Sequence, residues 1–171
     1  MEFDKICNVL VKLCTHGDLS QLQEMSHLEL KHIQHNNNYA FRYACCYGHL
    51  EVLKWLVDTF ELTLMDVRSL GNDALNLACK HGHLNILQFL IGCFQLSKDD
   101  YVSFVDWYWI SLMTKACEEE NGFMVSWFLI NFPRNRILLN RIPKKWHIFV
   151  KEILNENENE IMIKPASKHC T

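Results

Sequence analysis

The 171-residue chain is 49% hydrophobic and carries a formal net charge of −3 at pH 7. This length suits one domain of ordinary size, and the hydrophobic content excludes a chain that is disordered throughout. No apolar run approaches the roughly 20 residues of a membrane span, and the first residues lack the basic and apolar segments of a signal peptide. We therefore expect an intracellular, cytoplasmic protein with no membrane segment.

Residues 2–16 are predicted to form the first helix, because six apolar side chains recur there at helical spacing. They are Phe3, Ile6, Cys7, Leu10, Leu13 and Cys14. Ser26 and Glu29 further along have the spacing of a capping box, so another helix is expected to start there. Residues 1–37 are interpreted as a degenerate first repeat with a polar outer face, as expected at the end of a repeat array.

Residues 38–71 align with residues 72–105 at a step of 34, with 13 identical residues. Unrelated sequences of ordinary composition would share about two. A fixed period in this range predicts a solenoid of stacked supersecondary units. The identities fall at Asn38, Ala40, Ala44, Cys45, Gly48, His49, Leu50, Leu53, Leu56, Phe60, Leu62, Asp66 and Ser69.

Each central unit is predicted to contain two helices and a helical connection. Residues 39–47 place small and apolar side chains on one face of a first helix, and Gly48 follows where that helix must turn. Residues 50–57 carry the apolar stripe of a second helix. Thr63 and Asp66 are spaced as a helix start, which predicts a third short helix instead of a hairpin. The same spacing recurs at Ser97 and Asp100.

Residues 106–142 are interpreted as a decayed fourth unit, because Ala116 and Cys117 match the alanine and cysteine of the earlier units. Glu120 stands in place of the repeat glycine, so the turn is expected one or two residues later, at Asn121 and Gly122. Pro133 is expected to end the second helix of this unit. Residues 144–154, after Pro143, carry the apolar stripe of a closing helix, and the polar residues after them are expected to fray.

Residues 44–56, ACCYGHLEVLKWL, resemble the ankyrin repeat, and residues 78–90, ACKHGHLNILQFL, are similar. The resemblance implies an all-α, ankyrin-like solenoid of about four stacked helix-turn-helix repeats, with helical connections and a C-terminal capping helix. The expected ranges are 1–37, 38–71, 72–105 and 106–142 for the repeats, and 143–171 for the capping helix and a flexible polar tail. Departures from the usual repeat resemble the divergent ankyrin arrays of large DNA viruses of protists and amoebae, which implies a host cytoplasm.

This resemblance implies a non-catalytic protein–protein interaction module, an adaptor or inhibitor-like scaffold that binds an unidentified protein partner on its concave face. In the family, contact positions lie just before the first helix and just before the glycine. The matching candidates here are Asn36, Asn38, Tyr47, Asn72, Lys80 and His81. A structural protein that self-associates stays open as the alternative, although the sequence favours a monomer over a homo-oligomer.

Three successive aromatic residues, Trp107, Tyr108 and Trp109, form the most unusual stretch of the chain. Side chains of consecutive residues on a helix or strand cannot all point into the core. At least one is therefore expected to be partly exposed, and tryptophan and tyrosine are favoured as interface anchors. The hypothesis is that one of the three anchors a partner, while the alternative interpretation assigns Phe104 and one of the tryptophans to the core between repeats.

The sequence predicts no catalytic residue, no metal and no cofactor. Cys79, His81 and His83 offer three possible metal ligands, but no second pair stands at matching spacing. His49 and His83 belong to the repeat, where a hydrogen bond at the helix start is expected to explain them. The eight cysteines are expected to be mostly reduced core residues; a secreted disulfide scaffold is the other interpretation.

Residues 121–151 contain six basic residues and no acid. Such an excess can contact phosphate or an acidic protein. Nucleic-acid binding usually shows more charge together with a recognisable reading module. The chain is acidic overall and shows neither, so an acidic protein partner or solubility is the favoured explanation.

Overall fold

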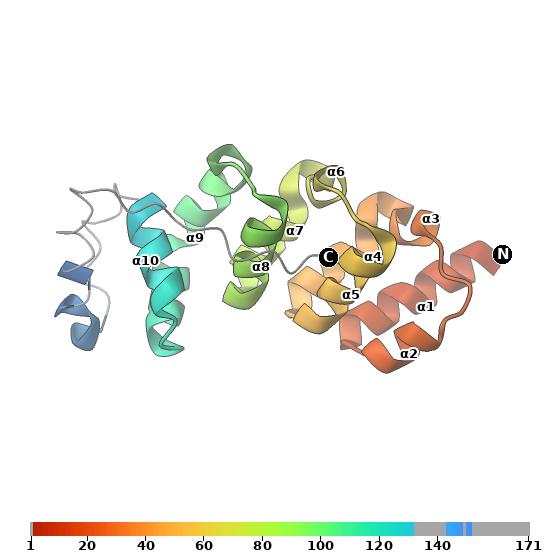
Figure 1. Cartoon of the computed structure of the whole chain (residues 1–171), viewed down its shortest axis with the longest axis horizontal. Coiled ribbons are helices and arrows are strands. Elements are labelled where there is room, and N and C mark those ends of the chain that lie inside the picture. The colour runs from red at the N-terminus through yellow and green to blue at the C-terminus, as the bar shows by residue number, and fades with distance from the viewer. Residues whose placement is uncertain (1, 132–142, 149, 152–171) are drawn as a thin grey trace. The chain divides into compact units, whose positions relative to one another are not determined.

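The computed structural model describes residues 2–131, 143–148, 150 and 151, apart from the side chains of residues 98, 102–107 and 131 (Figure 1). Within these residues the chain is helical with short turns and contains no strand, as the sequence predicts. The chain divides into two compact units between Leu96 and Ser97. No helix in the described part is long and apolar enough to span a membrane.

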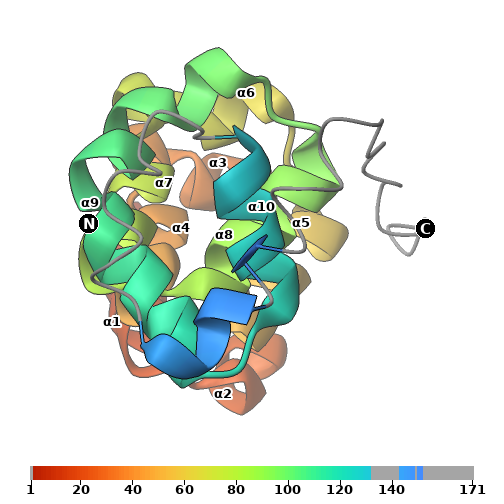
Figure 2. The same cartoon turned by 90° about the vertical axis from the view of Figure 1, so that its left-hand side faces the viewer.

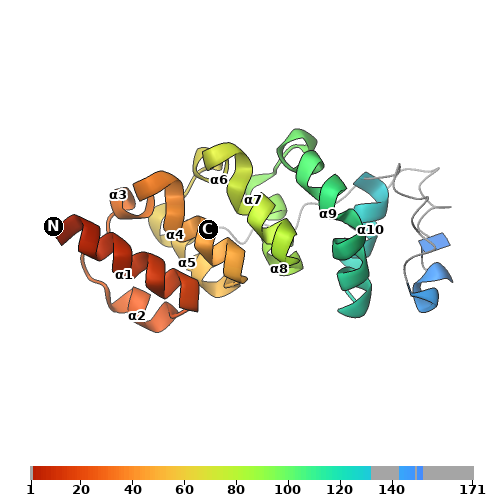
Figure 3. The same ribbon diagram turned by 180° about the vertical axis from the view of Figure 1, so that it is seen from behind.

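The N-terminal unit contains three helical repeats. Its first helices, α1, α4 and α7, lie side by side with α4 in the middle (Figure 3). Each is followed by a second helix, and seen from the end of the row, α4 and α7 lie on one side and α5 and α8 on the other (Figure 2). Two short helices, α3 and α6, connect the repeats. The bounds are α1 Glu2–His16, α2 Leu19–Glu24, α3 Leu30–Ile33, α4 His35–Tyr47, α5 Leu50–Phe60, α6 Leu64–Val67, α7 Ser69–His81 and α8 Leu84–Phe94.

Small residues on the first helices make this close stacking possible. Ala40, Ala44, Ala74 and Ala78 are buried, so neighbouring first helices can approach closely. One cysteine at the same place in each repeat completes this layer. Cys14, Cys45 and Cys79 are buried free thiols, as the sequence predicts.

A glycine in left-handed conformation ends the first helix of each repeat in this unit. Gly17, Gly48 and Gly82 have φ of 74°, 79° and 69°. The turn is closed by a bond from the amide of His49 to the carbonyl of Ala44 at 3.0 Å. This conformation is costly for residues with a Cβ, so the predicted role of the glycines is confirmed.

The histidine after each central glycine contacts the preceding repeat. Nε2 of His49 lies 2.9 Å from the carbonyl oxygen of Thr15, and Nε2 of His83 lies 2.9 Å from that of Cys46. Neither imidazole caps its own helix, so the expected hydrogen bond at the helix start was wrong. The bond instead runs to the backbone of the repeat before, because the ring lies over that repeat's glycine.

The first repeat has an aspartate in place of this histidine. Asp18 caps α2 by accepting a bond from the amide of Gln21 at 3.1 Å and another from the Ser20 hydroxyl at 2.9 Å. These bonds lower the pKa of Asp18. The residue in this position of the first repeat thus caps its own helix.

Two of the three predicted capping boxes are confirmed. The Thr63 amide donates to Oδ2 of Asp66 at 2.8 Å, and the Ser97 amide donates to Oδ2 of Asp100 at 2.9 Å. The predicted box at Ser26 was wrong. The helix α3 starts one residue after Glu29, which is therefore the cap residue itself, and the Glu29 amide donates to Nδ1 of His32 at 3.0 Å.

The C-terminal unit contains α9 Lys98–Glu118, α10 Gly122–Asn131 and the short 3₁₀ helix η2 Lys144–Trp146. The helix α9 covers both the expected short connecting helix and the first helix of the fourth repeat. Trp146 donates from Nε1 to the carbonyl of Cys117 at 2.9 Å, which holds η2 against the end of α9. Pro133, Phe149 and residues 152–171 lie outside the described residues, so the domain boundary at 142 and the length of the capping helix stay predictions.

The turn of the fourth repeat is in register, which corrects the late turn expected at Asn121 and Gly122. Glu120 itself takes the left-handed conformation, with φ of 53°. The Asn121 amide donates to the carbonyl of Ala116 at 2.9 Å, as the equivalent residues do in the earlier repeats. A non-glycine residue is used here at a conformational cost of order 1–2 kcal/mol.

Candidate interaction face of the first helices

Three tyrosines form a stripe along the side of α4 next to its buried alanines. Tyr39, Tyr43 and Tyr47 follow one another at intervals of four residues, so they share one helix face. Tyr39 and Tyr43 are half-buried, and Tyr47 is 51% exposed. The Tyr39 hydroxyl donates to the Tyr43 hydroxyl at 2.7 Å, and this bond is the main cause that raises the pKa of Tyr43. The stripe is therefore an aromatic surface whose first two hydroxyls are joined by a hydrogen bond.

An ion pair behind the stripe joins two repeats. The guanidinium of Arg42, on α4, pairs with the carboxylate of Asp73, on α7. Arg42 is only 8% exposed, its Nε donates to the carbonyl of Asn37 at 3.0 Å, and its Cζ lies 5.3 Å from the ring centre of Tyr39. These contacts hold the start of the stripe in one arrangement, which reduces the entropy lost when a partner binds.

Polar and basic residues flank the stripe on the neighbouring first helices. The equivalents of the tyrosines on α1, counted back from Gly17, are exposed: Asn8, Lys12 and His16. On α7 the last turn exposes Lys80 and His81. The face formed by α1, α4 and α7 thus has an aromatic centre with lysines on both sides, and we refer to it as the first-helix face.

Four of the six candidates predicted in the N-terminal unit are exposed on or beside this face. They are Asn36, Tyr47, Lys80 and His81. The other two are Asn38 and Asn72. Asn38 is 5% exposed and donates to the carbonyl of Asp66 at 3.2 Å, while Asn72 has a buried amide oxygen. Each of the two asparagines is the last of three left-handed residues that kink α4 and α7 near their starts, so their recurrence has a structural explanation.

The aromatic run lies in the C-terminal unit. Trp109 is 2% exposed, and its Nε1 is buried with no hydrogen-bond partner among the described residues. Tyr108 is half-buried, and the side chain of Trp107 lies outside the described residues. Of the described pair, Tyr108 is therefore the residue that a partner could reach in this structure.

The structure adds Tyr39 and Tyr43 to the residues that sequence reasoning proposed. Their signal was present in the sequence, since aromatic residues with a polar tip recur there every four residues. Sequence reasoning took from the family pattern only the positions before the first helix and the two before the glycine, so Tyr47 was the one tyrosine that it found.

The buried thiols are unsuited to nucleophilic chemistry. Burial raises the pKa of Cys14 and Cys79 to about 12 and that of Cys117 to about 11. Burial also raises the pKa of the half-buried Cys46, although Lys80 offsets part of the effect. Since the thiolate is the reactive form, these cysteines are poor nucleophiles near pH 7. Within the described ranges, no group of three or more His, Cys, Asp or Glu side chains could hold a metal ion.

Comparison with known proteins agrees with the repeat geometry. A family profile described as "Ankyrin repeats (3 copies)" matches residues 6–100, which is more than half of the 171 residues. Searches of curated proteins and of solved structures found no match. Ankyrin repeats are generally protein–protein interaction modules. The stacked helix pairs, the recurring glycine and histidine and the profile match together show that this chain belongs to the ankyrin repeat family.

Proposed function

We propose that the chain is a non-catalytic adaptor or inhibitor-like scaffold that binds a protein partner on the first-helix face. The observation that supports this most is the tyrosine stripe of α4, an ordered aromatic surface that the Arg42–Asp73 pair supports from behind. Tyrosine gives a large apolar contact together with a hydroxyl that can still bond, which is why it is favoured at binding hot spots.

Tyr47 is the proposed centre of the interface, with Lys80 and His81 on the neighbouring α7 and Asn36 at the other end of α4. Lys12 and Lys80 lie on opposite sides of the stripe and favour a partner whose contact surface is acidic at the rim. Asn38 and Asn72 act by shaping the left-handed kinks near the starts of α4 and α7. Tyr108 is proposed as a separate contact on the C-terminal unit, and Trp107 stays with it as a prediction.

The cellular setting is also a proposal. An intracellular location, in a host cytoplasm if the chain derives from a virus, agrees with free buried cysteines at positions 7, 14, 45, 79 and 117. We infer a monomer that meets a different protein.

Site-specific photocrosslinking in the native cell tests the proposal. A benzophenone amino acid replaces Tyr47 in one variant of the full chain and Met65 in another; Met65 is 75% exposed on α6 and outside the first-helix face. We expect one protein to crosslink through position 47 and not through position 65. Equal crosslinking at both positions, or none at 47, would count against the proposal.

Light scattering of the purified chain distinguishes the alternative function. A mass that stays monomeric as concentration rises agrees with a different protein as partner. A mass that rises with concentration, and returns to the monomer when Tyr47 is replaced by alanine, would instead identify a self-associating assembly protein.

A further inference from the structure

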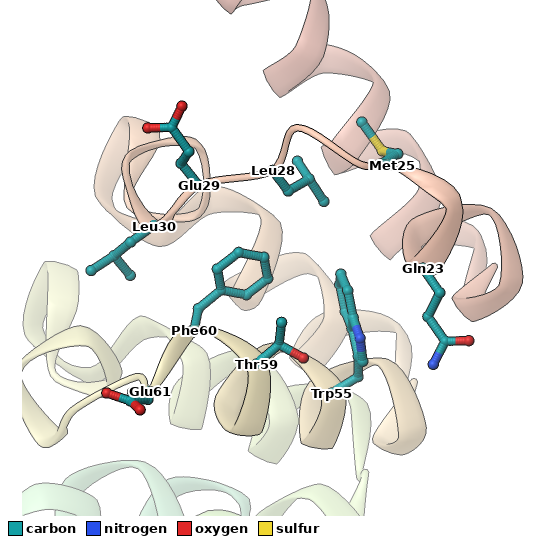
Figure 4. Close-up of a pocket in the computed structure, with 9 residues that line it drawn as sticks. All are labelled: Gln23, Met25, Leu28, Glu29, Leu30, Trp55, Thr59, Phe60 and Glu61. Carbon is teal, nitrogen blue, oxygen red and sulfur yellow. The ribbon is translucent and has the colours of Figure 1, made fainter.

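A groove of about 650 Å³ lies on the N-terminal unit beside α5, lined by residues outside the first-helix face (Figure 4). Trp55, Thr59 and Phe60 form one wall from the second half of α5. Met25, Leu28 and Leu30 face them from the loop after α2 and from the start of α3. The groove is therefore built between the second helix of one repeat and the connection that precedes its first helix.

The groove exists because the second helix of the first repeat is short. The helix α2 has 6 residues, whereas α5 and α8 have 11 each. It ends at Glu24, so the second half of α5 faces a loop and the four-residue α3 instead of a full helix. Side chains that a longer α2 would cover are left at the surface.

The lining is apolar at its centre. The rings of Trp55 and Phe60 meet edge to face, with centroids 5.5 Å apart and planes at 88°. Both are half-buried, as are Met25 and Leu28, while Leu30 is 41% exposed. Large apolar side chains gathered around a surface groove are typical of a binding site for another apolar side chain.

One end of the groove is negative. Glu29 and Glu61 both lie at the end marked by Leu30 and Phe60 (Figure 4). Glu29 already pairs with Lys31 at 2.8 Å, but Glu61 is exposed and makes no ion pair among the described residues. Glu61 is also the C-cap of α5, where the unpaired carbonyls of the helix end add negative potential.

We propose that this groove binds a short peptide of another protein that carries one large apolar side chain and, within a few residues, a lysine or arginine. The apolar side chain lies against Trp55 and Phe60, and the cation lies at Glu61 and the end of α5. The negative end disfavours an anionic membrane surface, since like charges repel there. The chain would then hold two partners of opposite charge, with the basic-flanked first-helix face for one and this groove for the other.

Selection from a random library of 12-residue peptides on phage tests the proposal with the full chain as bait. We expect enrichment of sequences with an aromatic or large aliphatic residue close to lysine or arginine. An enriched peptide labelled with fluorescein should bind the chain, as measured by fluorescence anisotropy. Its affinity should fall as the salt concentration rises, because the contact of the cation is exposed. No enriched motif, or a motif that is acidic or purely polar, would overturn the proposal.

Variants of the bait locate the bound peptide. Thr59→Arg fills the groove from an exposed helix position. It is expected to lower the affinity for the labelled peptide at least tenfold. Glu61→Lys reverses the charge at this position. It is expected to lower the affinity for the labelled peptide about fivefold, in the range of an exposed ion pair. Asp58→Lys makes the same change of charge on the same helix outside the groove lining, and Tyr47→Ala changes only the first-helix face. Both should leave the affinity unchanged.

The pattern among these variants decides the outcome. If Thr59→Arg and Glu61→Lys bind the peptide like the wild type, or if Asp58→Lys weakens it as much as Glu61→Lys does, the groove is not the site. If Tyr47→Ala abolishes binding while Thr59→Arg does not, the peptide binds the first-helix face. The groove proposal then fails, while the proposed function of the first-helix face does not.

Discussion

The imidazole of His83 lies over Gly48, and its Nε2 is 2.9 Å from the carbonyl oxygen of Cys46, two residues before that glycine. A Cβ added to Gly48 would lie 2.6 Å from Nδ1 of His83, closer than real Cβ contacts. Gly48 therefore serves two purposes: it takes the left-handed turn after α4, and it leaves room for the histidine of the next repeat. The recurring glycine and histidine form one contact between repeats.

Gly48→Ala is expected to destabilise the chain more than Gly71→Ala does. Both glycines are left-handed, with φ of 79° and 64°, so each substitution carries a conformational cost of order 1–2 kcal/mol. A Cβ at Gly71 meets nothing within 4 Å, so only Gly48→Ala adds the collision with His83. Urea unfolding measures the free energy of unfolding of both variants. Equal losses of this free energy would show that the collision with His83 does not destabilise the chain.

His83→Ala is expected to restore part of the stability that Gly48→Ala removes. Alone, it removes the bond to Cys46 and costs about 1 kcal/mol. In the double variant the collision is absent, so the combined loss should be smaller than the sum of the single losses. A double-mutant cycle from urea unfolding gives this coupling energy, and simple additivity would contradict the described contact.

Asp66→Asn is expected to lower stability at pH 7 and to matter less at low pH. Burial raises the pKa of Asp66, but bonds from Thr63, Gln34 and Asn38 outweigh burial and lower it below its usual value. An aspartate with a lowered folded pKa contributes stability above its unfolded pKa, near 3.9, and that contribution is lost as pH falls toward the folded pKa.

We expect a loss of about 1 kcal/mol at pH 7 for Asp66→Asn, in the range of a helix cap. The difference from the wild type should shrink at pH 3, which urea unfolding at the two pH values measures. Asp58→Asn, on an exposed position of α5, is the control. A difference that is the same at both pH values would contradict the described bonds.

Asp73→Ala is expected to cost about 2 kcal/mol, because it leaves the guanidinium of Arg42 buried with its ion-pair partner removed. The side chains of that pair are only 10% and 26% exposed. Glu51→Ala breaks the pair with Lys54, whose side chains are 70% and 42% exposed, and should cost under about 0.5 kcal/mol. Thermal unfolding of the two variants compares them directly, and similar losses would show that Arg42 keeps water or another partner.

The buried thiols are expected to resist alkylation in the folded chain. Burial raises the pKa of Cys14 and Cys79 to about 12, so little thiolate exists at pH 7.5. Labelling with iodoacetamide, followed by peptide mass spectrometry, should modify these two slowly without urea and quickly in about 8 M urea, where the chain is unfolded. Fast labelling of Cys14 or Cys79 in the folded chain would contradict their burial.

Features set within one repeat could be predicted from the sequence. The turn at Gly48 and the helix start at Thr63 and Asp66 depend on residues only a few positions apart, and spacing rules describe such local bonds well. The period of the repeat predicted the stacked helix pairs for the same reason, since each copy repeats one local pattern.

Features set between repeats could not be predicted in the same way. The bond of His83 to Cys46 spans 37 positions and depends on how two repeats stack. A residue that recurs in successive repeats can also do so for either of two reasons. Asn38 and Asn72 recur because both belong to a left-handed kink, whereas other positions recur because the family uses them for binding. The tyrosine stripe belongs to α4 and does not recur in the sequence of the other repeats, so a comparison of repeats could not reveal it.

The histidine contact also gives the array a direction. His49 and His83 each contact the repeat before them, whereas Asp18, at the same position of the first repeat, caps its own helix. A further copy of residues 38–71 inserted after position 71 would bring its own histidine and find a glycine to receive it. A copy fused ahead of α1 would meet an aspartate, so the histidine contact would be missing at that junction unless Asp18 is changed to histidine.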